Sequence, residues 1–219
     1  MDISDKNKYL AVAILVGGKS TRFGSDKGLF EFRGKHLISY QLETLADLRK
    51  NIFIVANSTE QLRIYFDAIN LENITGFIMD EPEILNDKNL RTPMLGMYSV
   101  FKELTKLNYD KVLILSCDLP FIKNEVLSLI FDKAEGHDCV IPRWDNDYLE
   151  PLFAIYPVKK ALIATEYCLK NKLYKLTNIL QDDWKTNYLS IERQIKQIDP
   201  NLISLANINE ISDLEYFNS

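Results

Sequence analysis

A glycine- and cation-rich stretch that follows an apolar run contains the residues best suited to chemistry. Residues Leu10–Val16 are all apolar and predict a buried strand. Residues 17–27 then contain three glycines and the cations Lys19, Arg22 and Lys27. Glycine lets the main chain approach an anion and adopt positive φ, backbone N–H groups can form an anion nest, and Lys and Arg neutralise the charge. The stretch predicts a loop that wraps around a polyphosphate.

The spacing of this loop excludes two common phosphate-binding motifs. A P-loop needs Gly-x-x-x-x-Gly-Lys-Ser/Thr, but Ala13 stands where its first glycine would be. A dinucleotide motif needs Gly-x-Gly-x-x-Gly, whereas the glycines here are at 17, 18 and 24. The remaining alternative to a phosphate site is a flexible loop with solvated charges.

A carboxylate at the end of another apolar run is the second chemical feature. Residues 111–116 predict a central strand, and Asp118 follows it after Cys117. Mg²⁺ prefers hard oxygen ligands and takes one or two carboxylates together with substrate phosphates. The alternative is a surface turn before Leu119-Pro120. Ligands of open α/β sheets bind beyond the carboxyl ends of the strands, so Gly17, Asn57, Asp80 and Asp118 are expected along one edge.

The elements that must position these residues alternate between apolar runs and helical periods, as in a βαβ protein. We therefore predict an α/β fold with one doubly wound, mostly parallel sheet of Rossmann-like topology, and a single domain over residues 1–219. The polar segment 143–150 predicts a hairpin or lid. The predicted strands are 10–16, 52–56, 77–79, 111–116, 140–141 and 152–156, and the predicted helices are 37–49, 59–69, 97–107, 124–134, 158–184 and a short one from Glu210.

Composition narrows the class of protein. The chain has 219 residues, of which 47% are hydrophobic and 26% charged, and its net charge is −5. Nucleic-acid binders normally carry a basic surface, so an acidic chain with a local basic loop favours a small anionic ligand. The polar first residues predict no secretory signal, and the apolar runs are too short to span a membrane. We expect a cytoplasmic protein that binds neither nucleic acid nor membrane.

Histidine and cysteine usage excludes further chemistries. His36 and His137 are the two histidines, too few for a histidine metal cluster and poorly placed for a Ser-His-Asp hydrolase, and we interpret both as structural. The three cysteines are widely spaced and odd in number, which predicts neither a disulfide framework nor a zinc site.

The glycine-rich loop resembles the motif Leu-x-Gly-Gly-x-Ser-x-Arg-x-Gly-x-Asp-Lys of the molybdenum cofactor guanylyltransferase family. Further segments are similar: Cys117–Pro120 to a Cys-Asp-x-Pro motif, Asn207-Ile208-Asn209 to a late Asn-x-Asn, and residues 150–156 to a Gln/His-Pro-Leu segment with Glu150 as the change. Residues 92–96 approximate a Gly-Pro-Leu-x-Gly loop in which Thr92 replaces the first glycine. The fixed positions matched in the loop are Leu15, Gly17, Gly18, Ser20, Arg22, Gly24, Asp26 and Lys27.

The resemblance implies an enzyme that transfers GMP from GTP to the phosphate of a molybdopterin-type cofactor, with Mg²⁺, releasing pyrophosphate. It implies transient contacts with other cofactor-biosynthesis or acceptor proteins. It implies that Arg22, Lys27 and Asp118 are catalytic and that Asp118 binds the metal. Asp80 would contact the nucleoside, where a carboxylate suits guanine N1–H and N2–H or a ribose hydroxyl; a local turn is the alternative. The implied binding residues are Leu15, Val16, Gly17, Gly18, Lys27, Asn57, Asp80, Gly96, Asp118, Asn207 and Asn209.

Three other functions stay open at this point. The first is a cytidylyltransferase of the same cofactor. The second is a sugar-phosphate or isoprenoid-alcohol-phosphate nucleotidyltransferase, although sugar-phosphate enzymes usually have a longer loop ending in Pro-Lys rather than Asp26-Lys27. The third is a non-catalytic nucleotide-binding adaptor, which the departures at Thr92 and Glu150 keep open.

Overall fold

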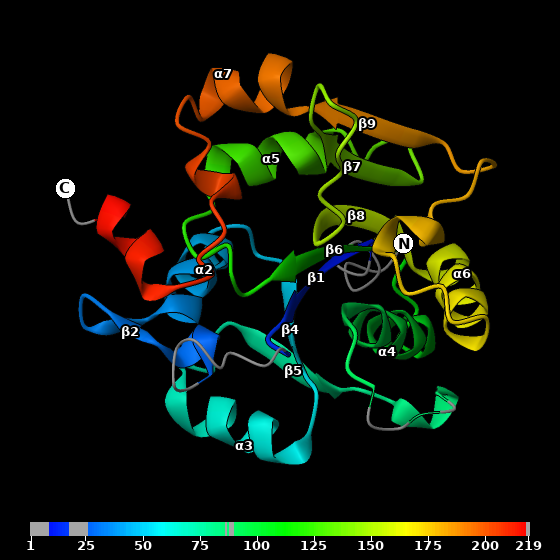
Figure 1. The fold of residues 1–219 in the computed structure, drawn as a ribbon, viewed down its shortest axis with the longest axis horizontal. Helices are drawn as coiled ribbons and strands as arrows, with labels where there is room; N and C mark the ends of the chain where they lie inside the picture. Colours follow the sequence, from blue (N-terminus) through cyan, green and yellow to red (C-terminus); the bar gives the residue numbers. More distant parts are fainter. Residues whose placement is uncertain (1–8, 18–25, 86, 88–89, 218–219) are drawn as a thin grey trace.

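A seven-stranded sheet forms the centre of the protein (Figure 1). The computed structural model describes residues 9–17, 26–85, 87 and 90–217. The strand order is β5-β4-β1-β6-β8-β7-β9, and a separate two-stranded hairpin pairs β2 with β3. The strands are β1 (Leu10–Leu15), β2 (Glu31–Phe32), β3 (Lys35–His36), β4 (Asn51–Ala56), β5 (Ile74–Met79), β6 (Lys111–Ser116), β7 (Cys139–Arg143), β8 (Phe153–Pro157) and β9 (Thr186–Ser190).

The sheet is mostly parallel, as predicted. The pairs β1–β4, β4–β5, β1–β6 and β7–β9 are parallel, and only β8 runs against its neighbours β6 and β7. The strand β1 is buried on both faces, because Val12 and Ile14 enter one core while Ala13 and Leu15 enter the other. A strand covered on both sides reads as a continuous apolar run, which is why the run 10–16 was a reliable signal.

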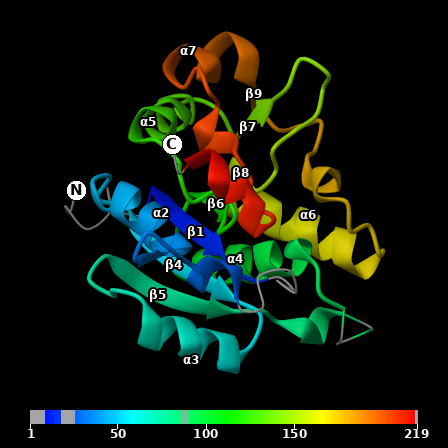
Figure 2. The ribbon, with the colours of Figure 1, turned by 60° about the vertical axis from the view of Figure 1, so that its left-hand side comes forward.

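Helices cover both faces of the sheet (Figure 1). One face packs against α2 (Leu37–Ala46), α3 (Thr59–Ala68) and α5 (Asn124–Asp132). The other packs against α4 (Pro93–Lys106) and α6 (Val158–Lys170). Figure 2 shows α3 alongside the edge strand β5, where the rings of Phe66 and Phe77 have centroids 5.8 Å apart. The doubly wound architecture predicted from the sequence is therefore confirmed.

The predicted helix over 158–184 is wrong in its second half. The helix α6 ends at Lys170, and the short η3 (Leu176–Ile179) follows after a break. Lys172 has φ 59°, and the N–H of Leu173 donates to the carbonyl of Cys168 at 2.8 Å. A left-handed residue followed by such a reverse bond terminates a helix. The strand β9 and the β2–β3 hairpin were not predicted. In β9 only Leu189 is fully buried, so its sequence lacks the alternation of apolar and polar residues that indicates a strand.

The C-terminal segment returns to the carboxyl edge of the central strands. It contains η4 (Ile191–Ile195), α7 (Lys196–Ile198), η5 (Ile203–Leu205) and η6 (Ile211–Phe217). Figure 1 shows η6 beside the β2–β3 hairpin, where Leu214 packs with Phe32. Among the described helices none is long and apolar enough to cross a membrane.

Candidate active site

Three polar residues from distant parts of the sequence meet beyond the ends of β1 and β6. Lys27 begins the short η1 helix (Lys27–Leu29), and its Nζ donates to Asn209 Oδ1 at 3.2 Å. The same Nζ lies 3.7 Å from Asp118 Oδ2. The Lys27 and Asp118 side chains are only 15% and 24% exposed, so solvent screens their attraction less than that of a surface pair. The structure thus brings together three of the predicted site residues.

The C-terminal segment is fixed to the same strand end through its main chain. The N–H of Ile208 donates to the carbonyl of Asp118 at 2.8 Å, and the Ile208 side chain is completely buried. This bond places Asn209 against Lys27. Asn207, which the sequence predicted to share the site, is exposed two residues earlier in the same segment.

The Asp118 carboxylate has one buried oxygen atom. Its Oδ1 is buried and has no hydrogen-bond partner among the described residues. A buried acceptor without a partner is costly, and a bound cation would satisfy it. The residues therefore fit a hard divalent cation held by Asp118 and by substrate phosphates. No group of three or more His, Cys, Asp or Glu side chains that could hold a metal occurs in the described ranges.

A buried network fixes the exit of the glycine-rich loop, just before Lys27. Asp26 caps η1 by accepting from the N–H of Gly28 at 3.2 Å, and it also accepts from Gln61 Nε2 and the Tyr65 hydroxyl. Tyr65 is fully buried, and burial raises its pKa far above the ordinary value. Gly28 packs so closely on Tyr65 that a Cβ there would overlap the hydroxyl oxygen and lie 3.2 Å from Cζ. This contact explains why position 28 is glycine.

Gln61 connects that network to the start of the loop. Its Nε2 donates to the carbonyl of Val16 at 2.9 Å, and its Oε1 accepts from the N–H of Asn57 at 2.9 Å. A single side chain thereby links the ends of β1 and β4 to Asp26. Sequence reasoning missed Gln61 and Tyr65, although their i, i+4 spacing places both on one face of α3.

A cavity of about 520 Å³ opens beside this cluster. It lies at the carboxyl ends of β1, β4 and β5 and at the first turn of α4, which is where open α/β sheets bind ligands. The volume lies within the range of small-molecule sites. The lining residues are Leu15, Gly17, Val55, Asn57, Asp80, Asp87, Leu90, Arg91, Thr92, Pro93 and Gly96.

Asp80 places a carboxylate in this cavity. Burial raises its pKa from 3.8 to about 7, and the positive charge of Arg91 opposes that rise. Gly96 is tightly packed there, since a Cβ would lie 3.1 Å from Leu15 Cδ2 and 3.4 Å from Asp80 Oδ1. The glycine keeps the surroundings of the carboxylate open. The exposed Arg91 is a lining residue that the sequence did not single out.

Thr92 has a local structural role that explains its presence in place of glycine. Its Oγ1 caps α4 by accepting from the N–H of Met94 at 3.3 Å, and Pro93 occupies the first helical turn. Ser, Thr, Asp and Asn are the favoured N-caps, and Pro is favoured at the first helical position. Threonine in place of the family's glycine at position 92 therefore still caps the N-terminus of α4, which lines the cavity.

Glu150 lies near Asp118 at the turn that leads into β8. Leu152 accepts from the N–H of Ser116 at 3.1 Å, which joins this turn to the end of β6. The Glu150 carboxylate accepts from Trp144 Nε1 at 2.7 Å. Burial raises the pKa of Glu150, the indole bond lowers it, and the negative charge of Asp118 raises it further. Segment 143–150 links antiparallel β7 and β8, so it is the predicted hairpin.

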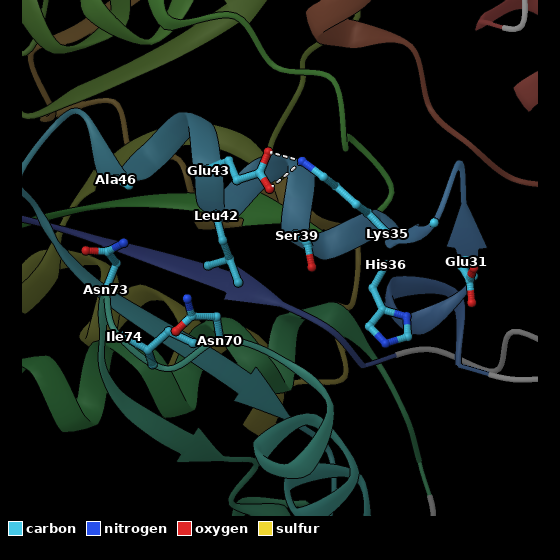
Figure 3. A pocket seen from close by; sticks show the side chains of 11 residues that line it. Glu31, Lys35, His36, Ser39, Leu42, Glu43, Ala46, Asn70, Asn73 and Ile74 are labelled. Carbon is cyan, nitrogen blue, oxygen red and sulfur yellow. Dashed lines mark hydrogen bonds and ion pairs between the residues drawn. The ribbon is translucent and has the colours of Figure 1, made fainter.

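A second cavity, of about 470 Å³, lies along α2 (Figure 3). Its cation Lys35 binds Glu43 at 2.7 Å, and the lining also includes Glu31. The Nδ1–H of His36 donates to the carbonyl of Leu29 at 2.7 Å, in keeping with a structural histidine. A polyphosphate would meet a paired lysine and two carboxylates here, so this cavity suits the nucleotide less well than the one at the strand ends.

Two predicted residues, Gly18 and Arg22, lie outside the described residues. Leu15, Val16 and Gly17 lie where β1 enters the loop; the N–H of Val16 donates to Val55 at 3.0 Å, and the carbonyl of Leu15 accepts from Cys117 at 3.1 Å. The three cysteines, Cys117, Cys139 and Cys168, are free and buried.

The doubly wound sheet, with Gly17 after the end of β1 and the Lys27–Asp118 pair beyond β6, has the architecture of a nucleotide-binding α/β enzyme. Residues 12–184 match the family model "MobA-like NTP transferase domain". The chain is 36% identical over 189 residues to a probable molybdenum cofactor guanylyltransferase of Pyrococcus horikoshii, an alignment that covers 84% of this chain and 88% of the relative.

Solved structures agree with the family model. The crystal structure of molybdopterin-guanine dinucleotide biosynthesis protein A from Archaeoglobus fulgidus superposes with a TM-score of 0.73 at 27% identity, covering 94% of this chain and 95% of that one. A manganese complex of a Mycobacterium tuberculosis protein shares the fold alone, with a TM-score of 0.55, 12% identity, and coverage of 83% and 88%. The chain belongs to the MobA-like NTP transferase family, and it is a nucleotidyltransferase.

Proposed function

We propose that this protein transfers GMP from GTP to the terminal phosphate of a molybdopterin-type cofactor, with Mg²⁺. The observation that carries the proposal is the assembly of Lys27, Asp118 and Asn209 next to a cavity that holds the Asp80 carboxylate. The curated relatives named molybdenum cofactor guanylyltransferase support the choice of acceptor.

The reaction needs no protein nucleophile. An oxygen of the acceptor phosphate forms a bond to the α-phosphorus of GTP, the bond between that phosphorus and the α–β bridging oxygen breaks, and pyrophosphate leaves. In phosphoryl transfer the protein mainly positions the reactants and stabilises developing charge. Lys27 would place a positive charge against the triphosphate, moving from the Asp118 carboxylate toward the phosphates. The main chain from Leu15 to Gly17 would line the nucleotide.

Asp118 would hold the metal through Oδ1, which has no hydrogen-bond partner in the part of the chain that the structure describes. Mg²⁺ bound there supplies charge neutralisation at the phosphates. Asp80 would accept hydrogen bonds from guanine N1–H and N2–H, and Asn57 would line the nucleoside. Asn209 would hold Lys27 in place, with Asn207 facing the acceptor side.

A pyrophosphate-release assay with each of the four nucleoside triphosphates, molybdopterin and Mg²⁺ tests the proposal. We expect release with GTP that depends on the acceptor. Activity with CTP alone would overturn the guanylyl assignment. Binding of GTP without pyrophosphate release, with acceptor and Mg²⁺ present, would instead identify a nucleotide-binding adaptor.

A further inference from the structure

Two side chains of opposite charge share the wall of the nucleoside cavity. Asp80 follows β5 and Arg91 lies just before the α4 N-cap, and both line the cavity. The two are close enough for Arg91 to lower the pKa of Asp80 against the effect of burial. Gly96 leaves room at Asp80 Oδ1, as described above. A ligand in this cavity therefore meets a carboxylate and a guanidinium together.

The hydrogen-bonding groups of these side chains match one nucleobase best. An ionised carboxylate offers two acceptor oxygens, and a guanidinium offers paired donors in a fixed planar arrangement. Guanine presents two adjacent donors, N1–H and N2–H, beside two acceptors, O6 and N7. Arginine bound through both groups to guanine O6 and N7 is a common and specific contact. Cytosine and adenine each present one amino group to a carboxylate in place of two donors.

We propose that Arg91 determines base specificity by donating to the O6/N7 edge of guanine while Asp80 accepts from the N1/N2 edge. This inference rests on the proposed guanylyl transfer and deepens it. Asp80 alone could also bind a ribose hydroxyl. Binding by Asp80 and Arg91 together requires the guanine base to lie between these two side chains. Arg91 has five N–H donors, so it can bind the base and still attract Asp80.

Analogues that each remove one base atom test the two residues separately. In 7-deaza-GTP the N7 acceptor is replaced by C–H, and ITP lacks the N2 amino group. A hydrogen bond to a charged group contributes about 1.5–3 kcal/mol, which corresponds to roughly tenfold to a hundredfold in affinity or kcat/KM. We expect the wild-type protein to lose about that factor with either analogue.

In the Arg91→Ala variant, the affinity or kcat/KM for GTP should fall by a similar factor. This variant should no longer distinguish GTP from 7-deaza-GTP. It should still discriminate against ITP, because Asp80 is intact. Asp80→Asn should show the opposite pattern. Arg63→Ala is the matched control, since Arg63 is an exposed arginine of α3 outside the cavity, and it should keep both preferences.

The proposal is overturned if Arg91→Ala keeps the wild-type preference for GTP over 7-deaza-GTP. It is also overturned if this variant lowers the affinity or kcat/KM for GTP, ITP and 7-deaza-GTP by one common factor. Arg91 would then act only through its effect on the charge of Asp80. The same comparison is made by calorimetric binding with Mg²⁺ and no acceptor. That measurement remains informative about Arg91 even if acceptor-dependent pyrophosphate release is not observed and the proposed function fails.

Discussion

Lys27 Nζ donates a hydrogen bond of 3.2 Å to Asn209 Oδ1 across 182 positions of sequence. The bond joins the end of the glycine-rich loop to the C-terminal segment, and the main-chain bond from Ile208 to Asp118 holds that segment in place. A free lysine side chain loses considerable rotamer entropy when it is ordered. Asn209 and Asp118 together keep the ammonium group oriented before the nucleotide arrives, so part of that entropy is already lost.

Replacing Lys27 by Met should reduce kcat/KM for pyrophosphate release by about a hundredfold to a thousandfold, the effect of removing one preorganised charge-stabilising donor. The Lys35→Met variant should keep wild-type activity, because Lys35 pairs with Glu43 outside the strand-end site. Steady-state kinetics with GTP and the acceptor measures both variants. Equal activities of the two would refute the role of Lys27.

Replacing Asp118 by Asn should abolish most turnover while leaving the fold intact. The amide keeps the size of the side chain but loses the charge that would hold the metal. Oδ1 has no hydrogen-bond partner among the described residues, and Oδ2 lies 3.7 Å from Lys27 Nζ, so the substitution should lower the free energy of unfolding, measured in urea, by no more than about 1 kcal/mol. A variant that releases pyrophosphate at the wild-type rate would show that the metal assignment is wrong.

The fold and the family could be predicted because their signals are local in sequence. Continuous apolar runs such as 10–16 and 111–116 mark strands buried on both faces, and each strand end then places its polar neighbour at one edge. Asp118 and Asp80 could be positioned in this way. The contacts that orient them could not, because nothing in the sequence near Lys27 indicates that Asn209 will pack against it.

Other parts of the site depend on packing that single residues do not reveal. Gln61 and Tyr65 read as ordinary members of an amphipathic helix, yet both turn toward Asp26. Glu150 read as a departure from a neutral family position, and only the structure shows its bond to Trp144. The roles of the predicted site residues remain predictions that the variants described here would test.

Replacing Gly28 by Ala should destabilise the protein by about 1–3 kcal/mol, the usual cost of overpacking a tight contact. The added methyl group would overlap the Tyr65 hydroxyl, and buried Tyr65 cannot move away freely. Adding Tyr65→Phe to Gly28→Ala should recover part of the loss, because it removes the overlapping oxygen. Urea unfolding of the wild type, both single variants and the double variant measures this coupling. If the changes in unfolding free energy of the two single variants simply add up in the double variant, the close contact between Gly28 and Tyr65 is not the cause of the destabilisation.

The affinity for GTP should increase as the pH rises through about 7, the value to which burial raises the pKa of Asp80. Only the ionised carboxylate accepts from both guanine N1–H and N2–H. Calorimetric titration of GTP with Mg²⁺ at about pH 6 and about pH 8 measures the effect. The Asp80→Asn variant should bind more weakly, with little pH dependence between these values. A wild-type affinity that is equally insensitive would contradict this role for Asp80.

The same group should make stability pH-dependent in the opposite direction. Because the folded pKa of Asp80 is raised above 3.8, its protonated form contributes stability that is full below about pH 4 and is lost as the pH rises to about 7. The free energy of unfolding of the wild type should fall relative to Asp80→Asn over this interval. The change is about 1.4 kcal/mol for each unit of pKa difference. Urea unfolding of both proteins without nucleotide measures it.

Replacing Glu150 by Gln should raise the Mg²⁺ concentration needed for half-maximal activity several-fold. Glu150 adds a second negative charge near Asp118, and that charge attracts a divalent cation to the site. The glutamine can still accept from Trp144 Nε1, so the hairpin should keep its structure. Asp147→Asn is the matched control, because Asp147 is an exposed carboxylate of the same hairpin. An unchanged Mg²⁺ requirement in Glu150→Gln, or an equal shift in both variants, would show that Glu150 does not act on the metal.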